Sequence, residues 1–206
     1  METVLLRKAN CRILIAEIPE NWDQLIPQLA NFNDYADEFK QINAVKRKNE
    51  FISVRILMNI LLRTTVRIKY DSDHKPYLSQ HEPTTSISVS HSGNFYAVAA
   101  SLKGVVGIDI EARTNRVVKV RKRYLDEEEL TFLYPNESTG GLEIAWSAKE
   151  ALFKCIGKDA YNFHTMKIQP FKQGKEGMLT ALFTPTGKEY TLHFHQTDTY
   201  TLVYSI

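Results

Sequence analysis

The chain has few cysteines, no long apolar run and no excess of one charge. Its 206 residues hold only two cysteines, Cys11 and Cys155, which are too few and too far apart for a disulfide framework. No apolar stretch approaches the roughly 20 residues that a membrane-spanning helix needs. The N-terminus also lacks the apolar run of a signal peptide. These absences predict a soluble, cytoplasmic protein that binds no membrane.

Charge does not indicate a nucleic-acid partner. Lysine and arginine number 26 against 24 aspartate and glutamate, so attraction to an anion must come from local clusters. The basic cluster 46–48 is short and lacks interleaved aromatics, which argues against nucleic acid. With 43% hydrophobic residues, the chain has ample material for a packed core.

Hydrophobic periodicity predicts an α+β fold made of two similar subdomains, residues 1–104 and 105–206. The second half repeats the order of helices and strands in the first, although no repeat is visible residue by residue. We expect helices at 22–32, 47–63, 125–133 and 142–156, and strands within 4–18 and at 86–90, 96–102, 105–111, 167–171, 178–184, 188–195 and 200–206.

Two acidic residues share one face of a predicted strand. In Val105-Val106-Gly107-Ile108-Asp109-Ile110-Glu111, alternation sends Asp109 and Glu111 to the side opposite the isoleucines. The solvated face of a half-buried strand would explain them, but acids are poor strand formers and need a reason here. Oxygen ligands suit Mg²⁺, and the histidines offer no zinc cluster. The pair is a candidate metal site.

A helical segment carries a second charged group. In Trp146-Ser147-Ala148-Lys149-Glu150-Ala151-Leu152-Phe153-Lys154, helical spacing places Glu150 near Lys149 and Lys154, with Trp146 and Phe153 beside them. An exposed Glu–Lys pair four residues apart would be ordinary. The bordering aromatics instead favour a groove that holds the charged groups.

Other segments fit chemistry less specifically. Ser88-Val89-Ser90-His91-Ser92-Gly93 lacks the G-x-S-x-G elbow of a hydrolase, and adjacent Ser90 and His91 on a strand point in opposite directions. The segment favours anion binding at a turn, or an ordinary junction. Arg47 and Arg55, two turns apart on a helix, are candidate phosphate ligands or simply a solvated face.

Taken together, these segments resemble the 4′-phosphopantetheinyl transferase superfamily, in its surfactin-synthetase-activating, two-subdomain type. The resemblance lies in Lys75-Pro76-Tyr77, Ile87 to Gly93, Gly107 to Glu111 and Trp146 to Lys154, together with the basic helix. It covers about half of the chain. One departure is His74, where the family usually has glycine, so the local turn is expected to differ.

The resemblance implies that the chain transfers the phosphopantetheine arm of coenzyme A to a serine of an apo acyl or peptidyl carrier protein, and releases adenosine 3′,5′-bisphosphate. Mg²⁺, or Mn²⁺, would be held by Asp109, Glu111 and Glu150, with Lys154 stabilising charge. The resemblance assigns coenzyme A contacts to Arg47, Arg55, Lys75, Pro76, Ser90, His91, Lys149 and Lys154. It further implies a pseudo-twofold fold and a monomer.

Several alternatives stay open at this stage. Glu150, a metal-bound water or Glu129 could accept the serine proton, and Glu129 could instead belong to a helix capping box that begins at Asp126. A metal-dependent phosphohydrolase would use the same carboxylates with water as nucleophile. A non-catalytic module that binds coenzyme A is the third possibility.

Overall fold

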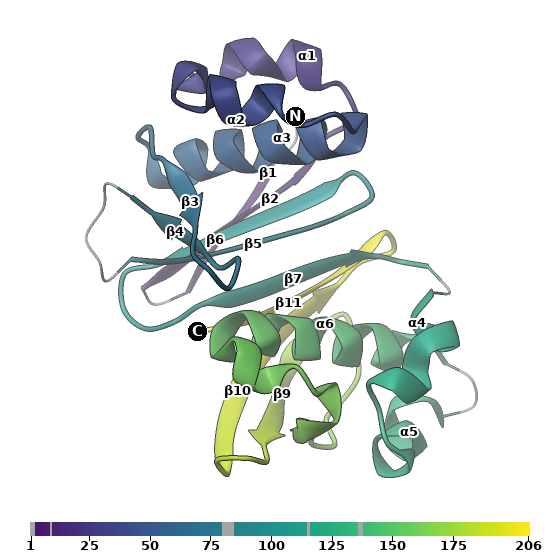
Figure 1. The fold of residues 1–206 in the computed structure, drawn as a ribbon. Helices are drawn as coiled ribbons and strands as arrows, with labels where there is room; N and C mark the ends of the chain where they lie inside the picture. Colours follow the sequence, from purple (N-terminus) through teal and green to yellow (C-terminus); the bar gives the residue numbers. More distant parts are fainter. Residues whose placement is uncertain (1–2, 9, 80–84, 115, 136–137) are drawn as a thin grey trace. The chain divides into compact units, whose positions relative to one another are not determined.

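The computed structural model describes residues 3–8, 10–79, 85–114, 116–135 and 138–206. The chain divides into two compact units, Met1–Val106 and Gly107–Ile206. Each unit combines an antiparallel sheet with one long helix, so the predicted mixture of α and β structure is confirmed (Figure 1). Within the described ranges, no helix is both long and apolar enough to cross a membrane.

The first unit is built on a four-stranded sheet in the order β1-β2-β6-β5. These strands span Thr3–Lys8, Cys11–Glu17, Phe95–Ser101 and Ser86–Ser92, respectively. Helix α3, Val45–Leu62, packs on β2 and β6, and the short helices α1 (Trp22–Leu25) and α2 (Ala36–Lys40) lie on its far side (Figure 1). The core of this unit therefore has a layer on each side of α3.

The helix predicted at 22–32 is wrong. Helix α1 ends at Leu25 and gives way to a 3-10 turn, Ile26–Gln28, that contains Pro27. Proline has no N–H to donate to the helical ladder, and its ring collides with the preceding turn. A second 3-10 turn, Phe32–Tyr35, leads into α2. The apolar spacing that indicates one helix is therefore shared among several short pieces.

A small hairpin follows α3. Strands β3 (Ile68–Tyr70) and β4 (Pro76–Leu78) pair through Lys69 and Tyr77, where the sequence predicts only a polar turn. The backbone N–H groups of Asp73 and Lys75 both donate to the Asp71 carboxylate at 2.9 Å. This carboxylate organises the connecting turn, which places Lys75 at the start of β4.

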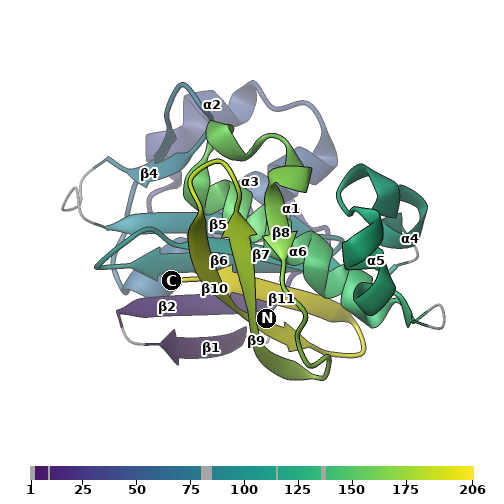
Figure 2. The same ribbon diagram turned by 90° about the horizontal axis from the view of Figure 1, so that it is seen from below.

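The second unit contains a five-stranded antiparallel sheet in the order β7-β11-β10-β9-β8 (Figure 2). The strands span Gly107–Ala112, Tyr200–Ser205, Lys188–Gln196, Glu176–Phe183 and Met166–Ile168, respectively. Helix α6, Gly140–Ile156, packs against β7 and β11. Helices α4 (Arg116–Val120) and α5 (Glu127–Leu133) also pack on α6, and 3-10 turns span 121–123, 158–160 and 163–165.

Gly107 permits the close contact between β7 and α6. A Cβ atom at this position would lie 2.0 Å from the Ala151 carbonyl oxygen and 2.6 Å from the Cys155 sulfur. Any side chain would push the helix away from the strand. Since Asp109 and Glu111 share the strand face of Gly107, they lie on the side of β7 that faces α6.

Candidate active site

The second unit brings Asp109 and Lys154 into direct contact. The Lys154 ammonium donates to Asp109 Oδ1 at 2.9 Å and to the Ile108 carbonyl oxygen at 2.8 Å. The Asp109 side chain is only 8% exposed, so the attraction is weakly screened by solvent. Strand β7 and the last turn of α6 are joined by this ion pair.

Glu150 lies in the same electrostatic environment. The pKa of Glu150 is raised to about 7, chiefly by burial and then by the Asp109 carboxylate; Lys154 opposes this effect and Glu111 adds to it. Burial and the neighbouring carboxylates therefore make Glu150 easier to protonate than an ordinary glutamate. Asp109, Glu111, Glu150 and Lys154 form what we call the acid cluster.

The donor chemistry of the acid cluster fits a hard divalent cation. Its oxygen atoms suit Mg²⁺, and a bound cation would favour the ionised form of Glu150. As they stand, no three His, Cys, Asp or Glu side chains within the described ranges are grouped closely enough to hold an ion. The Lys154 ammonium supplies the positive charge instead. The metal assignment thus stays a prediction.

The two aromatic residues of the predicted groove on helix α6 make ring contacts of their own. Trp146 and Phe153 pack among other aromatic rings, with Trp146 5.1 Å from Tyr124 and Phe153 5.5 Å from Tyr161 between ring centroids. Both side chains are partly buried and pack against the core of the unit. The aromatic border of a charged groove therefore stays a prediction.

Lys149 is directed into the interior. Its side chain is completely buried and its ammonium donates to Glu129 at 2.9 Å and to the Tyr124 carbonyl oxygen at 2.6 Å. Burial lowers the pKa of Lys149, and Glu129 opposes that effect. A phosphate contact, the role assigned to Lys149 by family resemblance, does not fit this placement, because both contacts hold the ammonium inside the core.

Glu129 has a structural role. The Asp126 side chain accepts from the Glu129 N–H while the Glu129 side chain accepts from the Asp126 N–H, which is the capping box of α5. Glu129 also accepts from the Ile168 N–H at 2.9 Å and pairs with Lys149. Of the alternatives left open by the sequence, the structure favours the cap over the catalytic base.

In the first unit, three of the predicted phosphate ligands line a cavity of about 180 Å³. Arg47, Arg55 and His91 line it together with Glu50. Arg47 donates to Glu50 at 2.8 Å, and His91 Nδ1 lies 3.5 Å from the other Glu50 oxygen. Glu50 was not predicted, although its position one turn after Arg47 is the spacing of an intrahelical ion pair.

Arg55 is more deeply buried than a surface phosphate ligand would be. Its side chain is 2% exposed, and its guanidinium lies 3.3 Å from the centre of the Phe51 ring and 4.4 Å from that of Tyr35. Burial lowers the pKa of Arg55. Stacking between rings fixes the guanidinium in place.

Ser90 does not line this cavity. Strand β5 continues to Ser92, two residues past the predicted end, so Ser90 and His91 both lie within the strand. Alternation sends Val89 and His91 toward the cavity and buried Ser90 to the opposite face. The turn itself is Gly93-Asn94, in which Gly93 has φ +58°. Ser90 and His91 therefore face opposite sides of β5, and the anion site at the turn stays a prediction.

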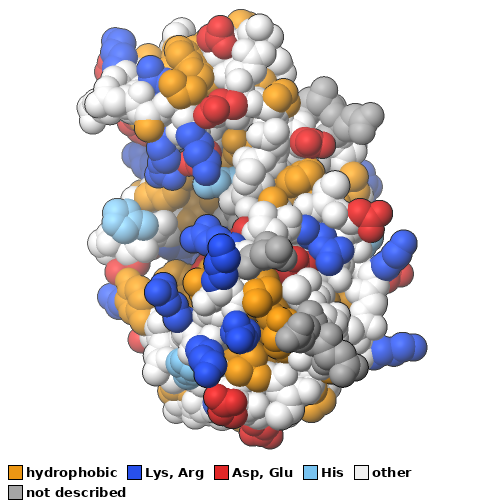
Figure 3. All heavy atoms as spheres, turned by 90° about the vertical axis from the view of Figure 1, so that its right-hand side faces the viewer, with side chains coloured by type: hydrophobic (Ala, Val, Ile, Leu, Met, Phe, Trp, Pro, Cys, Tyr) orange, Lys and Arg blue, Asp and Glu red, His pale blue; other side chains and the backbone are white. Residues whose placement is uncertain are grey.

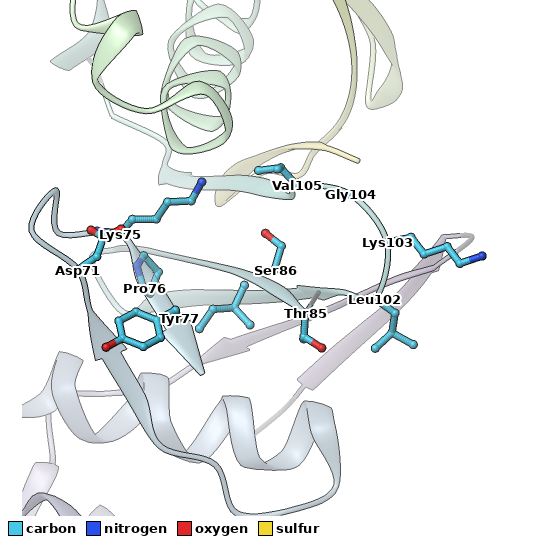
Figure 4. A pocket seen from close by; sticks show the side chains of 11 residues that line it. Asp71, Lys75, Pro76, Tyr77, Thr85, Ser86, Leu102, Lys103, Gly104 and Val105 are labelled. Carbon is cyan, nitrogen blue, oxygen red and sulfur yellow. The ribbon is translucent and has the colours of Figure 1, made fainter. Parts of the chain in front are cut away.

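Lys75 and Pro76 line a separate cavity of about 800 Å³ in the same unit. Its other walls include Ser86 from β5 and residues 102–105. In Figure 4, the Lys75 and Ser86 side chains point into this cavity, whereas the Lys103 side chain points away from it. The Ser86 hydroxyl accepts from the Val106 N–H at 3.2 Å, which holds the end of the unit in place.

His74 adopts the backbone conformation that glycine favours, with φ +59°. The turn is therefore built in the left-handed region despite the departure from glycine. Since this region costs a residue with a Cβ about 1 kcal/mol, we expect His74→Gly to raise the free energy of unfolding by about 0.5–1 kcal/mol. Urea denaturation measures the change. Ser72→Gly, in the same turn at negative φ, is the control and should lower stability.

The second unit brings together the features of the candidate site. It combines an antiparallel sheet, a helix packed on a glycine and an acid cluster with one lysine. The sequence model of the 4′-phosphopantetheinyl transferase superfamily matches residues 105–205, a range that contains the whole acid cluster.

One curated relative supports the same family. The chain is 27% identical over 124 residues to a Synechocystis sp. protein named "Putative 4'-phosphopantetheinyl transferase slr0495". The match covers 54% of this chain and 50% of that relative, so the chain spans about half the length of the relative it matches. Both comparisons show similarity to the 4′-phosphopantetheinyl transferase superfamily over part of the chain.

Proposed function

We propose that the chain transfers the 4′-phosphopantetheine group of coenzyme A to a serine hydroxyl of an apo acyl or peptidyl carrier protein and releases adenosine 3′,5′-bisphosphate. The observation that carries this proposal is the acid cluster, in which Asp109, Glu150 and Lys154 meet inside the half of the chain that matches the superfamily. The reaction is that of a holo-[carrier protein] synthase, with Mg²⁺ as the preferred cation.

The cation would be held by Asp109, Glu111 and Glu150. When bound, it supplies positive charge to the pyrophosphate oxygens of coenzyme A and orients them for in-line displacement. Lys154, which already lies 2.9 Å from Asp109, adds a second positive charge where the leaving phosphate becomes more negative.

Proton transfer falls to Glu150 in this proposal. The serine oxygen forms a bond to the β-phosphorus while the bond from that phosphorus to the adenosine bisphosphate oxygen breaks. The serine proton passes to a Glu150 carboxylate oxygen and then to solvent. Glu129 is unsuited to this task because it already accepts hydrogen bonds from Lys149 and two backbone N–H groups.

The first unit carries further candidate contacts for coenzyme A. Arg47, Arg55 and His91 share one cavity, which suits the phosphate groups, and Lys75 and Pro76 line the larger cavity, which suits the adenine. Glu50 would order Arg47 and His91 through its two contacts. Each cavity contributes a different part of the recognition.

We assign the carrier protein to a basic segment of the second unit. Residues 113–123 carry six basic side chains and no acidic one. Arg116, Lys119, Lys122 and Arg123 are exposed in α4 and the turn after it. Figure 3 views the side of the molecule where α4 lies and shows several lysine and arginine side chains there. A partner with an acidic surface would be attracted to such a segment.

Charge reversal tests this docking segment. We expect Lys119→Glu/Lys122→Glu to raise the KM for an acidic carrier protein about tenfold and to leave kcat nearly unchanged, because surface charges act mainly on encounter. The effect should shrink at high salt. Lys188→Glu, on β10, is the matched control. An equal effect of both variants would contradict the assignment.

The intact mass of an apo carrier protein tests the proposed function. The carrier is incubated with this protein, coenzyme A and Mg²⁺, with and without EDTA, over a panel from fatty acid, polyketide and peptide synthesis. A metal-dependent gain of one phosphopantetheine is the expected result. Cleavage of coenzyme A without carrier would instead indicate a phosphohydrolase. Coenzyme A binding without any product would indicate a binding module.

A further inference from the structure

Glu143 is a buried carboxylate outside the set of proposed cation ligands. Its side chain is 5% exposed, and it lies on α6 seven residues before Glu150, two turns along the same stripe of the helix. The sequence does not single it out, although Glu143, Ser147, Glu150 and Lys154 follow one another at spacings of four, three and four residues.

Three donors converge on Glu143. Arg113 Nε lies 3.0 Å from its carboxylate, and the Gln196 amide donates to it at 3.2 Å. The Thr201 hydroxyl is the third donor. The Gln196 amide also donates to the Thr201 hydroxyl at 3.0 Å and to the Gly140 carbonyl oxygen at 3.3 Å. A buried carboxylate with this many partners is held in one position.

Two partners of Glu143, Thr201 and Arg113, are neighbours of Glu111. Thr201 is the residue directly opposite Glu111 in the antiparallel pairing of β11 with β7. Arg113 follows Glu111 by two residues, and the Arg113 N–H continues the pairing by donating to the Thr199 carbonyl oxygen at 2.9 Å. Because residues two apart on a strand share a face, the Arg113 guanidinium emerges on the same side as the Glu111 carboxylate.

An unrestrained guanidinium here would compete with a cation. Arginine binds carboxylates through a rigid fork, and Glu111 would be its nearest alternative partner along the strand. Instead, Arg113 pairs with Glu143 and donates to the Thr197 carbonyl oxygen at 3.1 Å.

We propose that Glu143 is a positioning residue: it holds Arg113 by an ion pair and so keeps this guanidinium from neutralising Glu111. The inference rests on the proposed metal site. It adds that cation affinity depends on a carboxylate that is not itself a ligand, as is common for residues that orient metal ligands.

A Mn²⁺ titration followed by electron paramagnetic resonance tests the inference without coenzyme A or carrier protein. We expect Glu143→Gln to weaken Mn²⁺ binding about tenfold, since the amide keeps the size of the side chain but releases Arg113. The double variant Glu143→Gln/Arg113→Gln should return to within about twofold of wild type, because the competing guanidinium is gone. Asp126→Asn, which alters an ion pair of the same unit with Lys167, is the matched control.

Each outcome bears on a different claim. If wild type binds Mn²⁺ and Glu143→Gln binds it equally well, the positioning role is overturned. If the double variant stays as weak as the single variant, release of Arg113 is not the cause of the loss, and the inference is overturned as well. If wild type binds no Mn²⁺, the metal site of the proposed function fails first, and the role of Glu143 fails with it.

Discussion

Glu150→Gln is expected to stabilise the protein at pH 8 while it lowers phosphopantetheinyl transfer by more than about a hundredfold. The loss follows because glutamine can neither take the serine proton nor serve as an anionic cation ligand. The gain in stability comes from the removal of a buried charge. Burial and the neighbouring Asp109 carboxylate raise the pKa of Glu150 to about 7, so the ionised side chain is a cost to the folded state.

The difference in stability between Glu150→Gln and wild type depends on pH. The pKa of Glu150 is above its ordinary value of 4.5 in the folded state. The folded chain therefore holds this proton more tightly than the unfolded chain, and its contribution to stability falls as pH rises from about 4.5 to 7. Above pH 7 we expect Glu150→Gln to exceed wild type by about 2 kcal/mol, and near pH 4.5 the difference should vanish.

Urea denaturation at pH 4.5 and pH 8 in EDTA, paired with a transfer assay, measures both effects. Glu128→Gln, at an exposed position in α5, is the control and should change neither. Added Mg²⁺ should raise the stability of wild type at pH 8 but not that of Glu150→Gln. A variant that transfers normally would remove Glu150 from the site.

Lys149→Met is expected to lower the free energy of unfolding by about 3–5 kcal/mol, because it leaves the Glu129 carboxylate buried without its ammonium partner. Glu129 is 2% exposed and cannot reach water as it stands. The Tyr124 carbonyl oxygen loses its Lys149 donor at the same time. This prediction separates a structural lysine from a phosphate ligand.

The double variant Lys149→Met/Glu129→Gln supplies the contrast. It should recover about half of the lost stability, because a neutral amide can still accept from the Ile168 N–H without a buried charge. Lys122→Met, at an exposed position, should change stability by less than about 0.5 kcal/mol. A stable Lys149→Met variant with a raised KM for coenzyme A would instead restore the phosphate role.

The motifs predicted the centre of the site because their spacing decides which residues share a face. The alternation from Gly107 to Glu111 placed both acids on one side of a strand, and the helical segment placed Glu150 and Lys154 one turn apart. Both elements form as expected. The resemblance to the transferase superfamily is supported by the match over residues 105–205, while the surfactin-activating subtype stays a proposal.

Errors arose where periodicity does not record local chemistry. Pro27 ends α1 early, because a missing N–H outweighs a well-formed apolar stripe. Trp146 and Phe153 pack against Tyr124 and Tyr161, and helical spacing does not record such ring contacts.

The sequence by itself determined the chemistry of this protein: which carboxylates and lysines are available, and on which short elements they lie. Only the tertiary structure decided their partners. Lys149 and Lys154 are five residues apart on the same helix, yet one pairs with Glu129 in the core and the other with Asp109 on β7. Such pairing depends on which strand or helix packs against each stripe, and that contact is made by residues distant in the chain.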